Sequence, residues 1–490
     1  MTEPIIYELS VSGRSAAHLP ALDVPPSPLP PAHLLRRELD LPEVSEPDLM
    51  RHYVRLSQLN YSVDTGMYPL GSCTMKYNPK VNEDAARIPS LLNVHPLQPA
   101  ETAQGNLALM YGLQQALAEI GGFAGSSLQP AAGAQGELTG ILMIRAWHRA
   151  RGDTRRQVIL VPDSAHGTNP ASTSMAGLRA VEIRSDDRGN VDLEALAPHL
   201  NDQLAGIMLT NPNTLGLFDE HVCEVCRLVH EAGGLVYGDG ANLNALMGIV
   251  KPAQLGIDVM HFNLHKTFST PHGGGGPGAG PVGAGERLVD YLPGPIAVRK
   301  EGREGDQARY TLRMPAHSIG RMKAHYGHFA VLVRAYTYMR MLGAEGLRAS
   351  SEAAVLNANY LQALLRGVFP LPHDRTCMHE FVLEGRLADA PGIRALDIAK
   401  RLMDYGYHPP TNYFPLIVPE ALMIEPTETE SKQELDRFAS ALRSIAEEAR
   451  REPELLHNAP ISAPVRRLDE VRAARDLVLS WTRPTRPAED

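Results

Sequence analysis

Lys266 has the setting that most suggests chemistry in this chain of 490 residues. It follows an apolar, aromatic segment at 260–262 and His265, and it precedes a glycine-rich stretch at 272–278. An amine between a strand and a glycine loop, unlike a lysine solvated on a helix, can form a Schiff base with a carbonyl cofactor such as pyridoxal phosphate. A His-Lys pair at a strand end is more often an ordinary basic feature, so the prediction depends on other residues of the chain.

Asp239 is the first of these residues. The segment 233–242 is typical of a short apolar strand that ends at Asp239 and is followed by small residues. Open parallel sheets bind ligands at the carboxyl ends of their strands, and pyridoxal phosphate needs a carboxylate there to keep its ring nitrogen protonated. The interval between Asp239 and Lys266 leaves room for one helix and one further strand. Asp239 could instead only cap the next helix.

Three more segments point to the same edge of the predicted sheet. A loop of small residues at 129–136 leads into an apolar helix, whose backbone N–H groups and dipole suit a phosphate. His166 follows an apolar strand and could stack on a flat ring, although a lone loop histidine is more often merely solvated. Thr210 ends another apolar strand. The chain order is therefore phosphate loop, His, Thr, Asp and Lys around one crevice.

These residues resemble those of fold-type I pyridoxal phosphate enzymes, and more closely those of the glycine decarboxylase (P-protein) family of the glycine cleavage system. Most of the similar motifs lie between residues 60 and 280. They are YPLGSCTMKYNP at 68–79, the loop at 129–137, DSAHGTNP at 163–170, YGDGAN at 237–242, NLHKTF at 263–268 and IEPTET at 424–429.

The resemblance implies specific roles for site residues. Lys266 would carry pyridoxal 5'-phosphate as a covalent aldimine, Asp239 would pair with the pyridinium nitrogen, and His166 would stack on the ring. Lys266 and His166 would be the nearest candidates for proton transfers. The expected cofactor-binding set is Ala134, Gln135, Gly136, His166, Thr210, Asp239, Ala241, His265 and Lys266. The residues expected on the substrate or lipoyl-arm side are Thr74, Met75 and Lys76, and no metal is expected.

The resemblance also implies a reaction and partners. Glycine would displace Lys266, lose CO₂ and pass its aminomethyl group to the oxidised lipoyl arm of the carrier H-protein. The single-chain form of that enzyme is much longer, and this chain resembles only its C-terminal, lysine-bearing half. A companion subunit 1 that resembles the N-terminal half is therefore implied, with the two-subunit enzyme assembled as a heterotetramer.

Composition limits the other possibilities. A formal net charge of −9 provides no basic surface for nucleic acid. Four cysteines in so long a chain do not make a disulfide framework, which favours a reducing compartment and a cytoplasmic location. No apolar run of about eighteen residues and no signal sequence at the N-terminus are present, so we expect a soluble, unprocessed protein that does not enter a membrane.

The predicted fold class is α/β, of the fold-type I pyridoxal phosphate-dependent transferase kind. Strands and helices alternate from about 104 to 285, which predicts a doubly wound, mainly parallel sheet. We expect an N-terminal arm and extension at 1–90, a large cofactor-binding domain at 91–330, and a smaller C-terminal α/β domain with a surface tail at 331–490. The proline-rich segment 20–31 cannot be helical and should extend over a partner or the chain's own surface.

Three local predictions accompany this scheme. A long helix should run from about Arg321 to Leu342 and bend at Gly327. Thr427–Glu430 fits a capping box ahead of the next helix. The Cys223/Cys226 pair lies in a helix and is expected to pack in the core, with metal or redox use as the rarer outcome, whereas the setting of Cys73 suggests proximity to the site.

Three other functions could use some of the same residues. Another fold-type I enzyme, such as an aminotransferase, a decarboxylase of larger amino acids or a cysteine lyase, would share Asp239 and Lys266, but the segment 68–79 argues against it. A non-catalytic assembly subunit would not need the lysine, the acid and the phosphate loop together. The glycines at 273–276 resemble a hydrolase oxyanion loop, but the chain has no G-x-S-x-G nucleophile motif.

Overall fold

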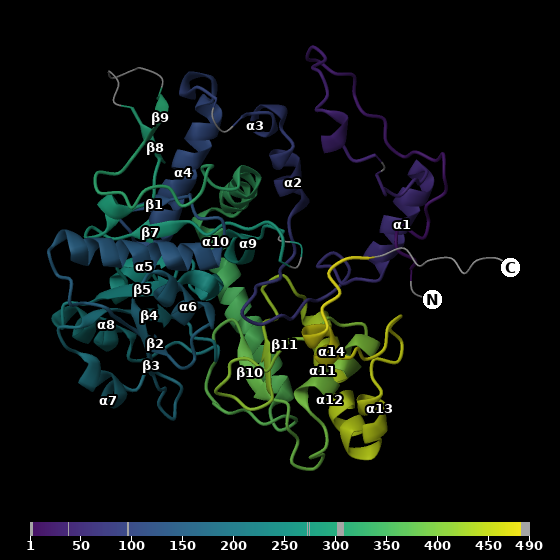
Figure 1. Ribbon diagram of the computed structural model, residues 1–490. Helices are drawn as coiled ribbons and strands as arrows, with labels where there is room; N and C mark the ends of the chain where they lie inside the picture. Colours follow the sequence, from purple (N-terminus) through teal and green to yellow (C-terminus); the bar gives the residue numbers. More distant parts are fainter. Residues whose placement is uncertain are drawn as a thin grey trace.

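The computed structural model describes residues 3–37, 39–95, 98–271, 273, 275–300 and 308–481. Its centre is a seven-stranded sheet with the order β1-β7-β6-β5-β4-β2-β3, in which only β7 runs antiparallel to its neighbours (Figure 1). The strands are β1 Gly125–Ser127, β2 Val158–Pro162, β3 Arg179–Ile183, β4 Leu204–Thr210, β5 Leu235–Asp239, β6 Val259–His261 and β7 Val282–Ala284. The predicted α/β class with a mainly parallel sheet is confirmed.

Helices cover both faces of this sheet. Leu160, Ile207 and Val236 pack in one core with α4 and α8, and Ile159 and Met208 pack in a second core with α5. Neighbouring strand residues thus bury their side chains on opposite faces, as a doubly wound sheet requires. The helices of this domain are α4 Gln104–Gly121, α5 Gly133–Ala150, α6 Thr168–Met175, α7 Leu193–Leu196, η3 Ala197–His199, α8 Val222–Glu231, η4 Gly240–Ala245, η5 Pro252–Leu255, α9 Leu264–Thr267 and η6 Val289–Tyr291.

A smaller domain follows at the C-terminus. A three-stranded antiparallel sheet, ordered β10-β12-β11, packs against helices. Buried residues of α12 recur at helical spacing, for example Leu435, Phe438, Leu442 and Ile445. The elements of this domain and the C-terminal end are β10 Phe381–Glu384, α11 Ala395–Asp404, β11 Thr411–Asn412, β12 Ala421–Ile424, α12 Lys432–Arg451, α13 Pro453–His457 and α14 Glu470–Arg475. A separate two-stranded ribbon, β8 Ile296–Arg299 with β9 Tyr310–Arg313, packs on α4 of the large domain.

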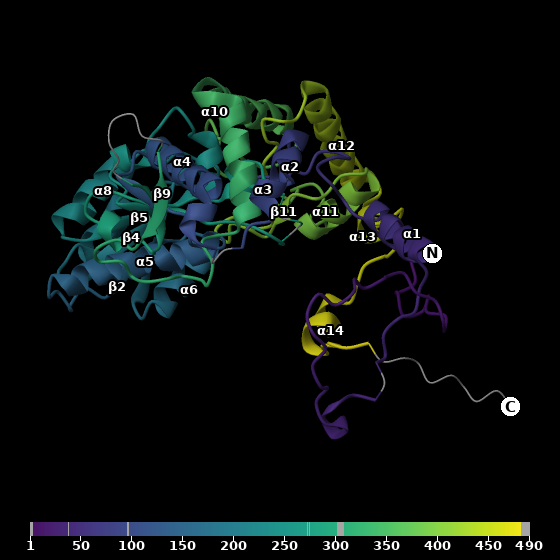
Figure 2. The same ribbon diagram turned by 90° about the horizontal axis from the view of Figure 1, so that it is seen from above.

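The N-terminal segment divides into a projecting part and a packed part. Residues 20–31 are exposed and contain no helix or strand, as predicted for an arm. Figure 2 shows this part and α14 extending together away from the two domains, where the rings of Tyr7 and Trp481 stack with centroids 4.8 Å apart. The short elements here are η1 Ala32–Leu34, α1 Glu46–Gln58, α2 Lys80–Ala86, α3 Pro89–Leu92 and η2 Ala100–Thr102. No helix in the described ranges is long and apolar enough to cross a membrane.

The long connecting helix differs from its prediction. It is α10, Phe329–Leu365, so it begins later and ends later than expected, and its non-helical residue is Gly343 rather than Gly327. Side chains of the large domain bond to the backbone before α10: Gln129 and Gln135 hydrogen-bond to the N–H and the carbonyl of Met322. The first half of α10 packs in the core of the large domain and its last turns pack in the core of the small domain.

The predicted capping box at 427–430 is also wrong. Ser431 is the N-cap of α12, and its side chain accepts from the backbone N–H of Glu434. Thr427 has a φ of 64° and is buried ahead of the turn that precedes the helix. The acidic residue of that turn, Glu428, instead pairs with Lys76, a partner far away in the sequence.

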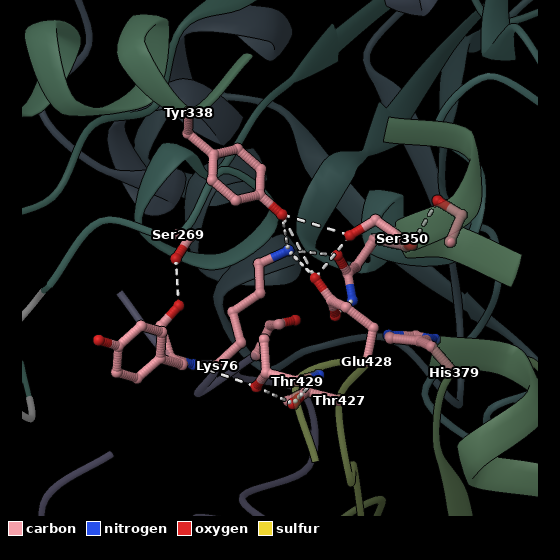
Figure 3. A network of polar contacts seen from close by, with 12 residues as sticks. Lys76, Ser269, Tyr338, Ser350, His379, Thr427, Glu428 and Thr429 are labelled. Carbon is pink, nitrogen blue, oxygen red and sulfur yellow. Dashed lines mark hydrogen bonds and ion pairs between the residues drawn. The ribbon is translucent and has the colours of Figure 1, made fainter. Parts of the chain in front are cut away.

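A buried polar network around Lys76 joins the two domains to the N-terminal segment (Figure 3). The Lys76 amine is 2.7 Å from Glu428 Oε1, and it donates to Asn244 of η4 at 2.8 Å and to Tyr338 of α10 at 3.2 Å. Ser350 donates to the same carboxylate at 2.8 Å. Burial alone lowers the pKa of Lys76, but the charge and hydrogen bond of Glu428 outweigh it, so the pKa of Lys76 is raised.

We expect Lys76→Met to destabilise the protein strongly, because it leaves the Glu428 carboxylate buried without its cation. The loss should be about 3–5 kcal/mol in the free energy of unfolding, measured by urea denaturation. The double variant Lys76→Met/Glu428→Gln should recover part of it. Lys80→Met is the matched control, because Lys80 pairs with Asp64 at the surface. Equal losses for Lys76→Met and Lys80→Met would contradict the structural role of the network.

Candidate active site

A cavity of about 170 Å³ opens at the carboxyl edge of the parallel sheet. Loops after β2, β4, β5 and β6 and the start of α5 meet there. The structure thus brings together the phosphate loop, His166, Thr210, Asp239 and Lys266, as the sequence predicted. The lining residues are Ser72, Gly133, Ala134, Glu137, His166, Thr168, Thr210, Thr214, Asp239, Ala241, His261, Asn263, His265 and Lys266.

Lys266 lies on α9, the single helical turn that follows β6. Leu264 and Thr267 are buried under this turn, which leaves His265 and Lys266 on the side of the cavity. The Lys266 amine donates to the backbone carbonyl of Ser72 at 2.9 Å. The N-terminal segment therefore supplies a wall of the site, a contribution that the spacing of the core motifs did not indicate.

Asp239 is the last residue of β5, and its side chain is buried. One carboxylate oxygen accepts from the Ala241 N–H at 2.9 Å, so Asp239 also caps η4, the alternative role considered for it. His261 Nε2 lies 3.6 Å from the same oxygen, and burial lowers the pKa of His261 and keeps its ring neutral. A buried carboxylate beside a neutral ring favours a positively charged ligand atom, which suits a protonated pyridine nitrogen.

His166 is connected to a buried acid through a threonine. The Thr168 hydroxyl lies 2.7 Å from His166 Nδ1 and 2.7 Å from Glu137 Oε1. The Thr168 N–H also donates to His166 Nδ1, which makes this nitrogen an acceptor and leaves the ring hydrogen on Nε2. Burial lowers the pKa of His166, so the neutral ring is the form that this environment favours.

Glu137 is the site residue whose role sequence reasoning missed. Burial, with the nearby charge of Asp239, raises the pKa of Glu137 to about 8. The carboxyl therefore keeps its proton near neutrality, while its Oε1 accepts from the Thr168 hydroxyl that also contacts His166 Nδ1. Its sequence signal was an acid among residues of α5 that face the sheet, since Gly136, Thr139 and Gly140 beside it are also buried.

The start of α5 provides the phosphate end of the cavity. No side chain caps this helix, and Gly133 and Ala134 line the cavity. Gln135 and Gly136 have other tasks: the Gln135 side chain bonds to the backbone of Ala131 and Met322, and a Cβ on Gly136 would lie 2.7 Å from His261. Gln135 could reach a phosphate only through its backbone, and the Gly136 N–H already donates to the Ala132 carbonyl at 2.9 Å.

The described residues around this cavity fit pyridoxal phosphate. Lys266 offers an amine, Asp239 a buried carboxylate, and α5 the uncapped N–H groups that bind anions. The Thr210 hydroxyl is buried there with no hydrogen-bond partner in the described structure, which suits a polar atom of a ligand.

A second cavity of about 430 Å³ adjoins the first, and it contains the residues expected on the substrate side. Thr74, Met75 and Lys76 line it, and His265 lines both cavities. The Lys76 amine is held in the buried pair with Glu428, and the substrate-side role of residues 74–76 stays a prediction. His272 and Gly274 of the glycine-rich stretch lie outside the described residues.

The cysteines are all free thiols. Cys226 of α8 is buried as predicted, but Cys223 on the same helix is exposed. Cys73 lies next to the site, as its setting suggested: burial raises the pKa of its thiol, and the charge of Lys266 acts on it in the opposite direction. The buried residues His379, Glu380 and Glu425 lie near Lys266 and were not singled out from the sequence.

The fold and the lysine-centred cavity define a fold-type I pyridoxal phosphate-dependent enzyme. Residues 140–275 match the family model of class-V aminotransferases, and residues 350–459 match that of the glycine dehydrogenase C-terminal domain. A probable glycine dehydrogenase (decarboxylating) subunit 2 of Caldanaerobacter subterraneus subsp. tengcongensis is 59% identical over 98% of this chain and 99% of its own length. The protein of the same name in Halalkalibacterium halodurans is 56% identical over 99% of each chain. The chain belongs to the glycine dehydrogenase (decarboxylating) subunit 2 family.

Solved structures agree on the fold. A glycine decarboxylase (P-protein) of the glycine cleavage system, in inhibitor-bound form, superposes with a TM-score of 0.72 at 21% identity, covering 85% of this chain and 93% of that chain. The glutamate decarboxylase of Lactobacillus brevis superposes with a TM-score of 0.63 at 16% identity, covering 86% and 96%. At these identities the likeness concerns the fold alone.

The buried acid in this cavity leads to a prediction about pH. Glu137 keeps its proton in the folded protein up to about pH 8, whereas the unfolded chain loses it near the ordinary glutamate pKa of 4.5. Stability from this group is therefore present at acid pH and is lost as the pH rises toward 8. Glu137→Gln should thus gain stability over the wild-type apoprotein between pH 5 and 8, by more than about 1 kcal/mol.

Urea unfolding of both proteins at several pH values measures this difference. Glu83→Gln is the control of opposite sign, because a hydrogen bond from Arg334 holds the pKa of Glu83 below its usual value. That variant should lose stability relative to wild type as the pH rises above the acid range. A constant difference for Glu137→Gln across the range would show that Glu137 is ionised in the folded protein.

Proposed function

We propose that this chain is the lysine-bearing subunit of glycine decarboxylase, with pyridoxal 5'-phosphate bound covalently to Lys266. The observation that carries the proposal is one cavity containing the Lys266 amine, the buried Asp239 carboxylate and the uncapped start of α5. Family membership along nearly the whole chain supports glycine as the substrate.

Each group has a defined task in this proposal. Bound pyridoxal phosphate supplies the electron sink for the electron pair left when CO₂ departs from glycine. Asp239 would hold the ring nitrogen protonated, and the N–H groups at the start of α5 would bind the phosphate. His166 and Ala241 lie on the cavity wall and would contact the cofactor, and the Thr210 hydroxyl would bond to one of its polar atoms.

Proton transfers belong to Lys266 and His166. The free Lys266 amine donates to the Ser72 carbonyl within the cavity, so it would remain beside bound cofactor and substrate. His166 presents Nε2–H, and its Nδ1 is connected to Glu137 through the Thr168 hydroxyl, which donates to Glu137 Oε1. The two candidates therefore come from different loops of the cavity wall.

The partners proposed are a companion subunit 1, assembled as a heterotetramer, and the lipoyl arm of the H-protein. The subunit 2 names of the relatives support the companion chain. The projecting arm and the C-terminal end expose large apolar side chains, which suit burial against a second chain: Leu19, Leu22, Leu29, Leu477, Val478 and Leu479. The four free thiols favour a reducing compartment, and we propose the cytoplasm.

Cofactor attachment gives the direct test. The purified protein mixed with pyridoxal phosphate and reduced with borohydride should carry the label on the peptide that contains Lys266. Lys266→Ala should show no visible absorbance from bound cofactor, and Asp239→Asn should lower glycine decarboxylation about 100-fold or more. Lys251→Ala is the control, because Lys251 pairs with Glu119 on the surface. A label on another lysine would contradict the proposal.

A second test concerns the partners. Exchange of glycine carboxyl carbon with CO₂ should be negligible with this chain alone, because the companion subunit and the carrier are missing. It should appear when both are added. Substituting Leu19, Leu22 and Leu29 with Asp should weaken association with the companion chain, followed by size-exclusion chromatography, without changing cofactor absorbance. Full activity of the isolated chain would overturn the two-subunit proposal.

A further inference from the structure

A buried group of ionisable side chains lies behind the loop that contacts Lys266. His379, Glu380 and Glu425 are each at most 1% exposed, and their nitrogen and oxygen atoms lie within 4.8 Å of one another. They adjoin because β10 and β12 pair antiparallel with Phe381 opposite Ile424, which brings the residues next to that pair together. The proposed function assigns no role to them.

Glu380 accepts hydrogen bonds on both of its carboxylate oxygens, although burial raises its pKa to about 7. Its Oε2 accepts from the Ser72 backbone N–H at 2.6 Å, and its Oε1 accepts from the Asn242 side-chain amide at 3.1 Å. The Asn242 amide cannot turn round, because it also donates to the Pro212 carbonyl at 2.9 Å. Both oxygens of Glu380 thus face N–H donors, and a carboxylate is the form that accepts on both.

Glu425 is the neutral member. Its Oε1 accepts from the Thr74 hydroxyl at 2.5 Å, and its Oε2 has no hydrogen-bond partner in the described structure. Burial, and next the charge of Glu380, raises the pKa of Glu425 well above its usual value. A carboxyl buried next to a carboxylate keeps its proton. Glu425 Oε2, which has no hydrogen-bond partner in the described structure, can carry that proton.

The other ionisable groups around this pair do not change the assignment. Lys266 provides the nearby positive charge for Glu380 and Glu425. Lys76 already neutralises Glu428, which Figure 3 shows close to His379. Burial lowers the pKa of His379 to about 3, so this ring is neutral, and the Cys73 thiol is also neutral because burial raises its pKa.

Glu380 is connected, through its hydrogen-bond partners, to Lys266 and Asp239, the two residues on which the cofactor site depends. Its partner Ser72 presents the carbonyl that accepts from the Lys266 amine, and its partner Asn242 lies in η4, the turn that Asp239 caps. Ser72 has a φ of 61°, a left-handed conformation that a serine keeps only when its surroundings hold it. The Glu380 carboxylate is the group bonded to its N–H.

We propose that Glu380 is a positioning carboxylate, which holds the Ser72 carbonyl against the Lys266 amine, and that Glu425 is its protonated neighbour. The inference rests on the proposed function only in taking Lys266 as the cofactor lysine. Glu380 does not touch the cavity, so it acts through the loop at 72–74 and through η4.

Two isosteric variants distinguish the two acids. Glu380→Gln puts an amide N–H against the Ser72 N–H or the Asn242 amide, so it should release the loop. Glu425→Gln puts an N–H where the carboxyl O–H stands, so it should be tolerated. We expect Glu380→Gln to slow covalent capture of pyridoxal phosphate by the apoprotein about tenfold or more, and Glu425→Gln to retain the wild-type rate.

The measurements are the rate of absorbance change after pyridoxal phosphate is added to the apoprotein, the pH titration of the bound chromophore, and thermal melting of each apoprotein. Glu380→Gln should shift the titration midpoint, whereas Glu425→Gln should not. If Glu380→Gln fails to fold, Asn242→Ala removes one donor to Glu380 and should give a slower capture than wild type.

The outcomes separate this inference from the proposed function. If the wild-type protein takes up no pyridoxal phosphate on Lys266, the proposed function fails. If wild type and Glu380→Gln capture it at the same rate, only the positioning role fails. Equal damage from Glu380→Gln and Glu425→Gln would overturn the protonation assignment, as would a metal ion found at one per chain whose removal reproduces the Glu380→Gln behaviour.

Discussion

The buried ion pair between Lys76 and Glu428 holds the N-terminal segment between the two domains. Both groups lie out of water, so each needs the other's charge and the hydrogen bonds from Asn244 and Tyr338 to offset desolvation. Because this pair tolerates little displacement, the preceding loop is fixed as well. That loop carries Ser72, whose carbonyl meets the Lys266 amine. A contact between domains thereby becomes part of the cofactor site.

Environment divides the buried acids of the site into charged and neutral groups. Glu428 faces Lys76 and Glu380 faces two N–H donors, so both suit the carboxylate form. Glu137 and Glu425 lie beside other acids, and burial raises the pKa of each. Glutamate therefore serves as a charged structural residue in one place and as a protonated acid in another.

Local pattern was sufficient for the sheet and for the centre of the site. Apolar strands that end in Thr210 and Asp239 lie in a parallel sheet, and its geometry brings such ends to one edge. Pattern failed where distant side chains override local preference. The backbone before α10 is not helical because Gln129 and Gln135 bond to it, and Glu428 pairs with Lys76 instead of capping α12.

The sequence by itself determined the α/β class, the order of the site motifs and Lys266 with Asp239 as the central pair, because each depends on short apolar segments and the residue that follows them. Only the tertiary structure decided what surrounds that pair. The Ser72 N–H reaches Glu380 across 308 residues of chain and Lys76 reaches Glu428 across 352. Hydrogen bonds and charge pairs at such separations leave no periodic trace in the sequence, since they depend on how whole domains pack.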